Sequence, residues 1–105
     1  MRFIETRIFT ADVTALLADD EYRRLQIALA LRPEQGALIR GSGGLRKMRW
    51  PVRGRGKRGG IRVIYHWEPV EDVCYMLRAY AKGAQEGLTR AQLRVLSRVV
   101  REEFG

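Results

Sequence analysis

The sequence predicts an α+β fold, a sandwich in which one curved antiparallel sheet of four to five strands packs against two N-terminal helices and a C-terminal helix. Apolar residues recur at helical spacing near both ends of the chain, and short alternating segments separated by glycine-rich turns occupy the middle. Strands joined by such turns are expected to pair as antiparallel neighbours, with the helices on one face of the sheet. Residues 1–105 are expected to form a single domain.

The N-terminal third predicts a strand followed by two helices. Residues 2–8 contain apolar and charged side chains in the alternation of a short strand. Thr10 or Asp12 is expected to cap the first helix. A second helix is predicted to begin at the acidic run 19–21, because negative side chains stabilise the positive end of a helix. Pro33 is expected to end it, because the residue before a proline is pushed out of the helical region.

The middle of the chain predicts strands, and the end predicts a helix. Residues 37–39 are a brief apolar segment, and residues 45–52 alternate between apolar and basic side chains. Two longer strands are predicted at 61–67 and 73–82, and the second of these is almost wholly apolar. Thr89 is expected to cap a final amphipathic helix.

The charge of the chain is concentrated in its middle. Lysine and arginine number 20 against 12 aspartates and glutamates, for a formal net charge of +8. Between Glu34 and Glu68 there is no acidic residue, yet nine cations lie within the 23 positions 40–62. Such charge repels itself unless a polyanion neutralises it, and nucleic acid is the commonest polyanion in a cell. A solvated, charge-rich loop is the alternative, but cations on predicted strands favour an RNA or DNA partner.

Several function classes are disfavoured by composition and context. The chain has one histidine and one cysteine, so no His/Cys metal site and no cofactor are expected. Residues 54–59 match G-x-G-x-x-G, but they join two strands with no helix after them, which favours a phosphate-contacting hairpin loop over dinucleotide binding. There is no apolar run of membrane-spanning length and no secretory signal, so we expect a cytoplasmic protein.

Four residues could take part in binding or catalysis, but each has a more common structural explanation. Cys74 lies within an apolar strand, where a buried thiol is more common than a reactive one. Trp50 and Trp67 have the side chains to stack bases, but both fall at alternating apolar positions that predict core packing. His66 is a candidate general base, although a lone histidine on a strand is more often structural or exposed.

A basic face of the sheet is expected to carry the chemistry. Guanidinium groups bind a phosphodiester through paired hydrogen bonds and stabilise charge on its transition state, while RNA supplies a 2′-hydroxyl nucleophile. A lysine or tyrosine whose pKa is lowered by neighbouring cations would take the proton. Strand alternation nominates Lys47, Arg49, Arg62, Tyr80 and Lys82 as catalytic residues. Further RNA contacts are expected from Arg46, Arg53, Arg55, Lys57, Arg58 and Arg78. The alternative is an exposed sheet edge.

Three motifs in a fixed order resemble the RelE superfamily of bacterial toxins, and within it the HigB-type branch. They are G-G-L-R-K-M-R at 43–49, G-R-G-K-R-G-G-I-R-V-I-Y at 54–65, and Y-A-K at 80–82 followed by Leu88-Thr89. The resemblance implies the toxin of a type II toxin–antitoxin pair, a ribosome-dependent and metal-free endoribonuclease that cuts mRNA by attack of the 2′-hydroxyl. It also implies an antitoxin partner, in a heterotetramer or a larger complex, and contact with the ribosome.

The same resemblance assigns roles by motif position. Lys47 and Arg49 match the paired basic residues of a strand, Arg62 matches the arginine that contacts the scissile phosphate, and Lys82 falls at or next to a basic position after the last strand. Some relatives carry a catalytic tyrosine or histidine near the C-terminus, whereas residues 86–90 here contain neither. The general base is therefore unassigned. A basic RNA-, DNA- or ribosome-binding module of the same fold that does not cut is the alternative.

Overall fold

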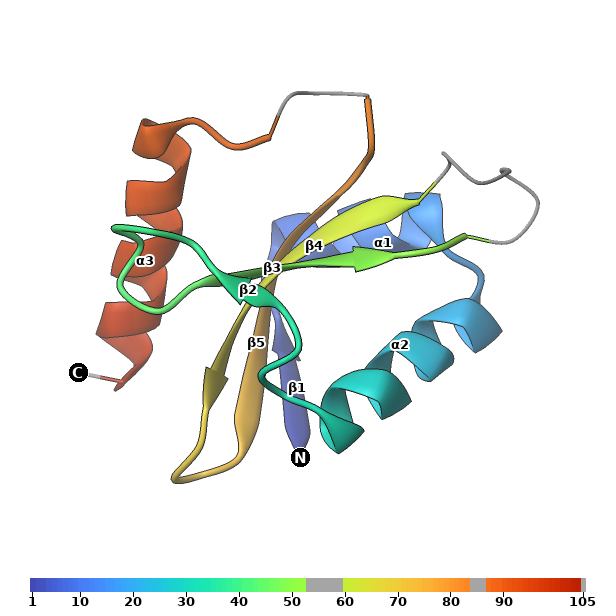
Figure 1. The fold of residues 1–105 in the computed structure, drawn as a ribbon, viewed down its shortest axis with the longest axis horizontal. Coiled ribbons are helices and arrows are strands. Elements are labelled where there is room, and N and C mark those ends of the chain that lie inside the picture. Colours follow the sequence, from blue (N-terminus) through green and yellow to red (C-terminus); the bar gives the residue numbers. More distant parts are fainter. Residues whose placement is uncertain (53–59, 84–86, 105) are drawn as a thin grey trace.

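The structure, a computed structural model, describes residues 1–52, 60–83 and 87–104 (Figure 1). Its strands form one five-stranded sheet in the order β1-β5-β4-β3-β2. The mixed α+β class and the order of elements are as predicted. These elements are β1 (Arg2–Glu5), α1 (Arg7–Leu16), α2 (Asp19–Leu31), β2 (Ala37–Leu38), β3 (Arg46–Trp50), β4 (Ile61–Glu68), β5 (Val73–Ala81) and α3 (Arg90–Phe104).

The sheet is mixed, so the prediction of a wholly antiparallel sheet is wrong at one edge. β2, β3, β4 and β5 pair antiparallel in sequence order, but β1 pairs parallel with β5. Parallel strands need a long connection, and here both N-terminal helices and three strands separate the two. A pairing between the two ends of the domain leaves no turn signal in the sequence.

The first helix begins earlier than predicted. The strand expected over 2–8 ends at Glu5, and Thr6 caps α1 by accepting a 3.0 Å hydrogen bond from the amide of Phe9. The Thr6 hydroxyl also donates to a carbonyl of β5 at 2.9 Å, which fixes the turn from strand to helix. Thr10 and Asp12, the predicted caps, lie inside the helix. The helix that starts here buries Phe9 against the sheet.

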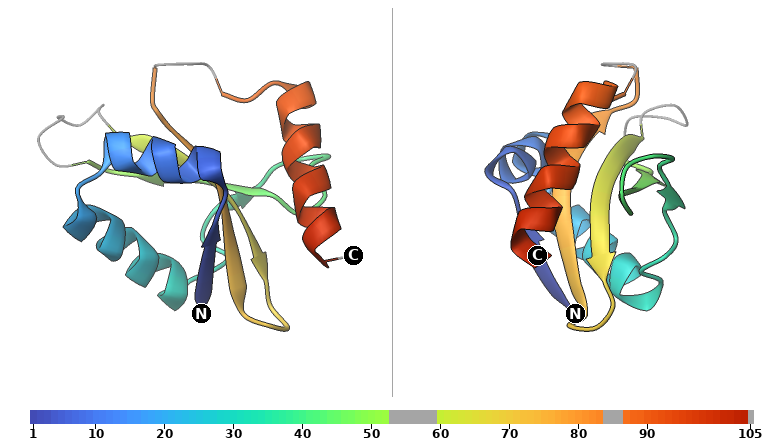
Figure 2. Two further views of the ribbon diagram at one scale, coloured as in Figure 1. Left: turned by 180° about the vertical axis from the view of Figure 1, so that it is seen from behind. Right: turned by 90° about the vertical axis from the view of Figure 1, so that its left-hand side faces the viewer.

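Helices cover both faces of the sheet, which corrects the prediction that they share one. Figures 1 and 2 show α1 and α2 on one side of the strands and α3 on the other. The physical reason lies in β5, where five consecutive residues from Val73 to Leu77 are buried. A strand that is apolar on both sides needs cover on both sides.

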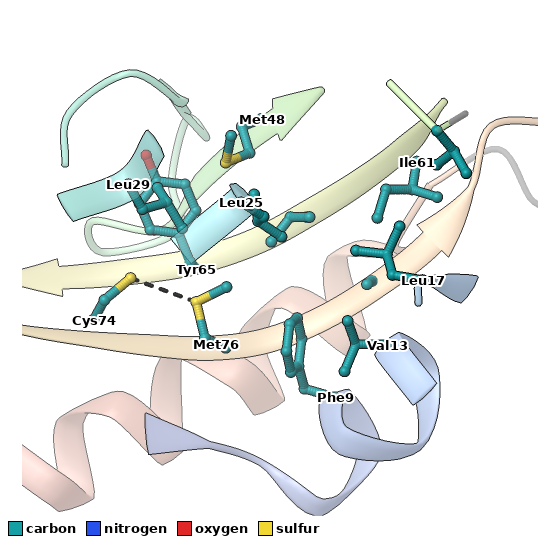
Figure 3. Packing of buried hydrophobic residues seen from close by; sticks show 13 residues of the cluster. Phe9, Val13, Leu17, Leu25, Leu29, Met48, Ile61, Tyr65, Cys74 and Met76 are labelled. Carbon is teal, nitrogen blue, oxygen red and sulfur yellow. Dashed lines mark hydrogen bonds between the residues drawn. The ribbon is translucent and has the colours of Figure 1, made fainter. Parts of the chain in front are cut away.

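The first core lies between the sheet and the N-terminal helices (Figure 3). Trp50 and Trp67 pack against it, as predicted, and Cys74 is fully buried, as predicted. Burial raises the pKa of the Cys74 thiol to about 12, so the group stays neutral at physiological pH. The residues in this core are Phe9, Val13, Leu17, Leu25, Leu29, Met48, Val52, Ile61, Val63, Tyr65, Cys74, Met76 and Ala79.

The second core lies under α3. Leu96 and Val100 of the helix pack with side chains from β4 and β5 and with Leu45, which precedes β3. Thr89 caps α3 as predicted: its hydroxyl accepts from the amide of Gln92 at 3.1 Å, and its own amide donates to the Gln92 side chain at 2.8 Å. No helix in the described part of the chain is long and apolar enough to cross a membrane.

Candidate active site

Three of the predicted catalytic side chains form a row across adjacent strands. Arg49 on β3 lies opposite Arg62 on β4, and Arg62 lies opposite Tyr80 on β5. Directly opposed residues of antiparallel strands project to the same side, with Cβ atoms about 4.5–5.5 Å apart. We call Arg49, Arg62 and Tyr80 the cross-strand row. It lies on the side of the sheet that α3 packs against, because Tyr80 belongs to the second core.

Two lysines flank the row. Lys47 precedes Arg49 by two positions on β3, so it projects to the same side about 6.6 Å along the strand. Lys82 follows Tyr80 by two positions, and its amide donates to the carbonyl of Gly60 at 3.0 Å, which extends the β4–β5 pairing past the end of β5. Both lysine side chains are exposed. Strand pairing and alternation therefore place the five predicted catalytic residues on one face of the sheet, with Lys47 and Lys82 on opposite sides of the row.

The cations of this site have no carboxylate partner in the described part of the chain. The salt bridges there join Asp72 to the N-terminus, Asp20 to Arg24 and Asp12 to Arg78. Within residues 1–52, 60–83 and 87–104, Arg62 makes a long 3.4 Å contact to the carbonyl of its neighbour Ile61. Guanidinium groups that have no carboxylate partner among the described residues are suited to bidentate binding of a phosphate.

Burial keeps the phenol of Tyr80 protonated at neutral pH. Its side chain is 8% exposed, and burial raises its pKa despite the opposing influence of the Arg62 and Arg78 guanidiniums. The neighbouring cations do lower the pKa of Tyr80, as predicted, but burial outweighs them and the net shift is upward. At neutral pH the phenol keeps its proton and can donate a hydrogen bond to an anion bound on the row.

Arg78, predicted to contact RNA, is engaged by the first helix. Its Nε donates to Asp12 Oδ2 at 2.8 Å, and the same oxygen accepts from the amide of Ala79 at 2.9 Å. Arg78 and Tyr80 lie opposite Ile64 and Arg62 in unbroken register, on the same side of the shift at Ile64 and Tyr65, so strand alternation still relates the two. Sequence reasoning missed Asp12 in this role, since nothing local connects it to a residue 66 positions away.

Arg46, also predicted to contact RNA, instead holds a loop. Its guanidinium donates to the carbonyls of Glu34 at 3.1 Å and Gly36 at 2.8 Å. Arg46 lies opposite Tyr65, whose phenol accepts from the Gly36 amide and donates to the Pro33 carbonyl, both at 2.8 Å. These contacts fix the connection between α2 and β2. The structure does not bring Arg46 to the cross-strand row.

His66 lies away from the row. It is four residues from Arg62 along β4, about 13 Å at strand spacing. Its Nδ1 donates to the carbonyl of Gly44 at 3.1 Å, a contact that supports the structural interpretation. No group of three His, Cys, Asp or Glu side chains that could hold a metal occurs in residues 1–52, 60–83 and 87–102. The predicted contacts Arg53, Arg55, Lys57 and Arg58 lie outside the described residues.

The arrangement of elements defines a RelE-like α+β sandwich, as the sequence predicted. A chain in the crystal structure of the archaeal RelE–RelB complex from Pyrococcus horikoshii OT3 superposes on it with a TM-score of 0.52. The match covers 80% of this chain and 97% of that chain at 21% sequence identity, a level at which the likeness concerns the fold. No protein-family model matches the sequence. Membership of the HigB-type branch stays a prediction.

Proposed function

We propose that this protein is the toxin of a type II toxin–antitoxin pair and an endoribonuclease that cuts mRNA on the ribosome. The observation that carries the proposal is the cross-strand row, flanked by Lys47 and Lys82 and without a carboxylate partner in the described residues. The RelE-like fold supports it, because the similar chain comes from a complex of RelE with RelB. The motif string of residues 43–82 supports the HigB-type branch and the dependence on the ribosome.

In the proposed reaction the row binds the scissile phosphate. Arg49 and Arg62 contact the non-bridging oxygens, and Tyr80 donates a hydrogen bond to one of them. The 2′-oxygen forms a bond to phosphorus while the bond to the 5′-oxygen breaks, which leaves a 2′,3′-cyclic phosphate and a 5′-hydroxyl. The guanidiniums stabilise the negative charge that grows on the phosphorane.

Proton transfer is assigned to the lysines, because a protonated Tyr80 cannot accept a proton. One of Lys47 and Lys82 takes up the 2′-hydroxyl proton, and the other gives a proton to the departing 5′-oxygen. The reaction then needs no other reactant. An antitoxin partner would inhibit it by covering this cationic face with acidic or apolar helical segments.

Expression of matched variants tests the proposal. Induction of the parent protein should arrest growth and leave mRNA fragments with 5′-hydroxyl ends, detected by mapping fragment termini. The double variant Arg62→Ala, Lys82→Ala should reduce cleavage by about 100- to 1,000-fold, the usual cost of removing a group that stabilises transition-state charge. Arg23→Ala, Arg32→Ala is the control, because it removes the same charge from exposed positions on and beside α2. Full growth arrest by the Arg62 and Lys82 variant would exclude the proposal.

A binding module that does not cut RNA is the second candidate. The raised pKa of Tyr80 favours it, because no other side chain of the row can act as a base. This candidate predicts RNA binding with a steep salt dependence and full recovery of intact RNA from the complex. Recovery of intact RNA from translating ribosomes exposed to the parent protein would favour it over the nuclease.

A further inference from the structure

A groove lined by arginines lies apart from the cross-strand row. Two adjoining hollows of about 310 and 250 Å³ lie between α3 and the turn before β3, and both are lined by Gly41 and Arg94. The larger is also bordered by Arg101, and the smaller by Arg40 and Arg90. Figure 1 shows this turn crossing α3 and leading into β3. We call the combined space the arginine groove.

Three of the arginines form a stripe along α3. Arg94 and Arg101 follow Arg90 by four and eleven positions, which places all three within about 40° of one another around a helix of 3.6 residues per turn. The stripe is about 16 Å long at 1.5 Å rise per residue. The stripe is longer than a single phosphate group, so it can contact several charges of a polymer that carries one charge at each repeat.

The wall opposite the stripe is held in place by hydrogen bonds. The Ser97 hydroxyl of α3 donates to the carbonyl of Ser42, which ties the turn to the helix. The buried Ser42 hydroxyl in turn donates to the Ile39 carbonyl at 2.6 Å and accepts from the Leu45 amide at 3.0 Å. Gly41 has a φ of +73°, a backbone conformation that other residues rarely adopt. These hydrogen bonds hold the turn against α3 and so fix the shape of the groove.

The charge of the groove is of one sign. Among the described residues, no carboxylate lines either hollow, and the arginines of the groove take no part in the salt bridges. Arginine is the side chain best suited to paired hydrogen bonds with phosphate or carboxylate oxygens. The arginines of the groove are therefore suited to bind an extended polyanion.

The position of the groove favours RNA over an acidic protein segment. Leu45 packs under α3 next to the groove, and Lys47 and Arg49 follow it at alternate positions, so all three project to the same side of the sheet. Lys47 thus lies between the groove and the row. A single strand of RNA can cross this face with cations beneath it from one site to the other.

We propose that the arginine groove holds backbone phosphates of the RNA strand whose scissile phosphate lies on the cross-strand row. This inference rests on the proposed function and adds a second contact with the substrate. The groove reads no base sequence, since its cations bind phosphates, which are common to all sequences. It supplies affinity and fixes the direction of the strand.

Binding of uncleavable 2′-O-methyl RNA tests the inference. A trinucleotide reaches only the row, whereas a dodecamer reaches the groove as well. Arg94→Ala, Arg101→Ala should weaken dodecamer binding about tenfold or more and reduce the slope of log K against log salt by about 1.4, since each lost single-strand phosphate contact contributes about 0.7. Trinucleotide binding should not change. Arg23→Ala, Arg32→Ala removes equal charge elsewhere and should match the parent slope, and circular dichroism checks that all variants fold.

The outcomes separate the inference from the function on which it rests. Equal dodecamer affinity in the groove variant and the control variant overturns the inference alone, provided the parent binds the trinucleotide. Binding of a polyglutamate peptide that depends on Arg94 and Arg101, together with dodecamer binding that does not, overturns it in favour of a protein partner. If the parent binds neither RNA, the inference fails, whereas the proposed function is decided separately by growth arrest and by fragments of ribosome-bound mRNA.

Discussion

Arg46 and Arg62 lie on neighbouring strands but have opposite fates. Arg46 donates to two backbone carbonyls of the loop between α2 and β2. Arg62 lies between another arginine and a tyrosine, with no carboxylate in salt-bridge contact in the described residues. The Arg46 guanidinium is bonded to the protein backbone, whereas the Arg62 guanidinium is proposed to bind the phosphate of the substrate. Residue type alone therefore does not identify the RNA-contacting cations of a basic chain, because the neighbours of each decide its role.

The largest effect that tests this comparison is expected at Arg62. Arg62→Ala should lower mRNA cleavage by about 100- to 1,000-fold while the free energy of unfolding changes by less than about 0.5 kcal/mol. In the proposed reaction the Arg62 guanidinium stabilises charge on the phosphate, and it is expected to contribute little to the stability of the folded state. Fragment mapping and urea unfolding of the same preparation measure the two quantities. A large loss of stability would mean that Arg62 belongs with the structural arginines.

Asp12 is expected to show the opposite pattern. Asp12→Ala removes the acceptor for Arg78 Nε and for the Ala79 amide, and both side chains of this pair are only about a fifth exposed. The unpaired groups should cost about 2–3 kcal/mol of stability. The urea midpoint measures this, with Asp19→Ala as an exposed control on α2. An unchanged midpoint would show that the pair is not structural.

Arg46→Ala should cost less. The loss of two charge-assisted hydrogen bonds to the loop carbonyls is expected to lower stability by about 1.5–2 kcal/mol, since Arg46 is only half-buried. Cleavage per folded molecule should stay near that of the parent, because the side chain does not reach the row. A cleavage defect as large as that of Arg62→Ala, measured at a temperature where both variants are folded, would contradict this separation of roles.

Much of the fold and of the row could be predicted because both depend on local patterns. Thr89 caps α3, Pro33 follows α2, and alternation on β3 assigns Lys47 and Arg49 to one side. A hairpin then places Arg62 across from Arg49, since consecutive strands pair and their side chains alternate in step. These inferences need only neighbouring residues and short turns.

The remaining features depend on contacts between distant parts of the chain. The parallel pairing of β1 with β5 and the bond between Asp12 and Arg78 join residues more than 60 positions apart. The position of α3 on the second face of the sheet follows from the burial of β5 on both sides. The almost wholly apolar sequence of β5 already contained this signal. The pKa of Tyr80 depends on how deeply the side chain is buried under α3, so the direction of the pKa shift could not be predicted from neighbouring charges alone.

The smallest expected effect is that of Tyr80→Phe, which tests whether Tyr80 donates a hydrogen bond or acts as a base. Because burial raises its pKa above 10, the phenol keeps its proton at all pH values from about 6 to 9. Tyr80→Phe should therefore lower cleavage by about tenfold, the worth of one hydrogen bond to a charged group, without altering the shape of the pH profile in that range. Because the pKa of Tyr80 is higher in the folded than in the unfolded protein, the unfolded chain loses this proton first as pH rises past about 10. The free energy of unfolding should therefore decrease above that pH, and it should decrease less in Tyr80→Phe. A rate for the parent that rises with pH as a phenolate forms, and loses that rise in Tyr80→Phe, would instead make Tyr80 the base.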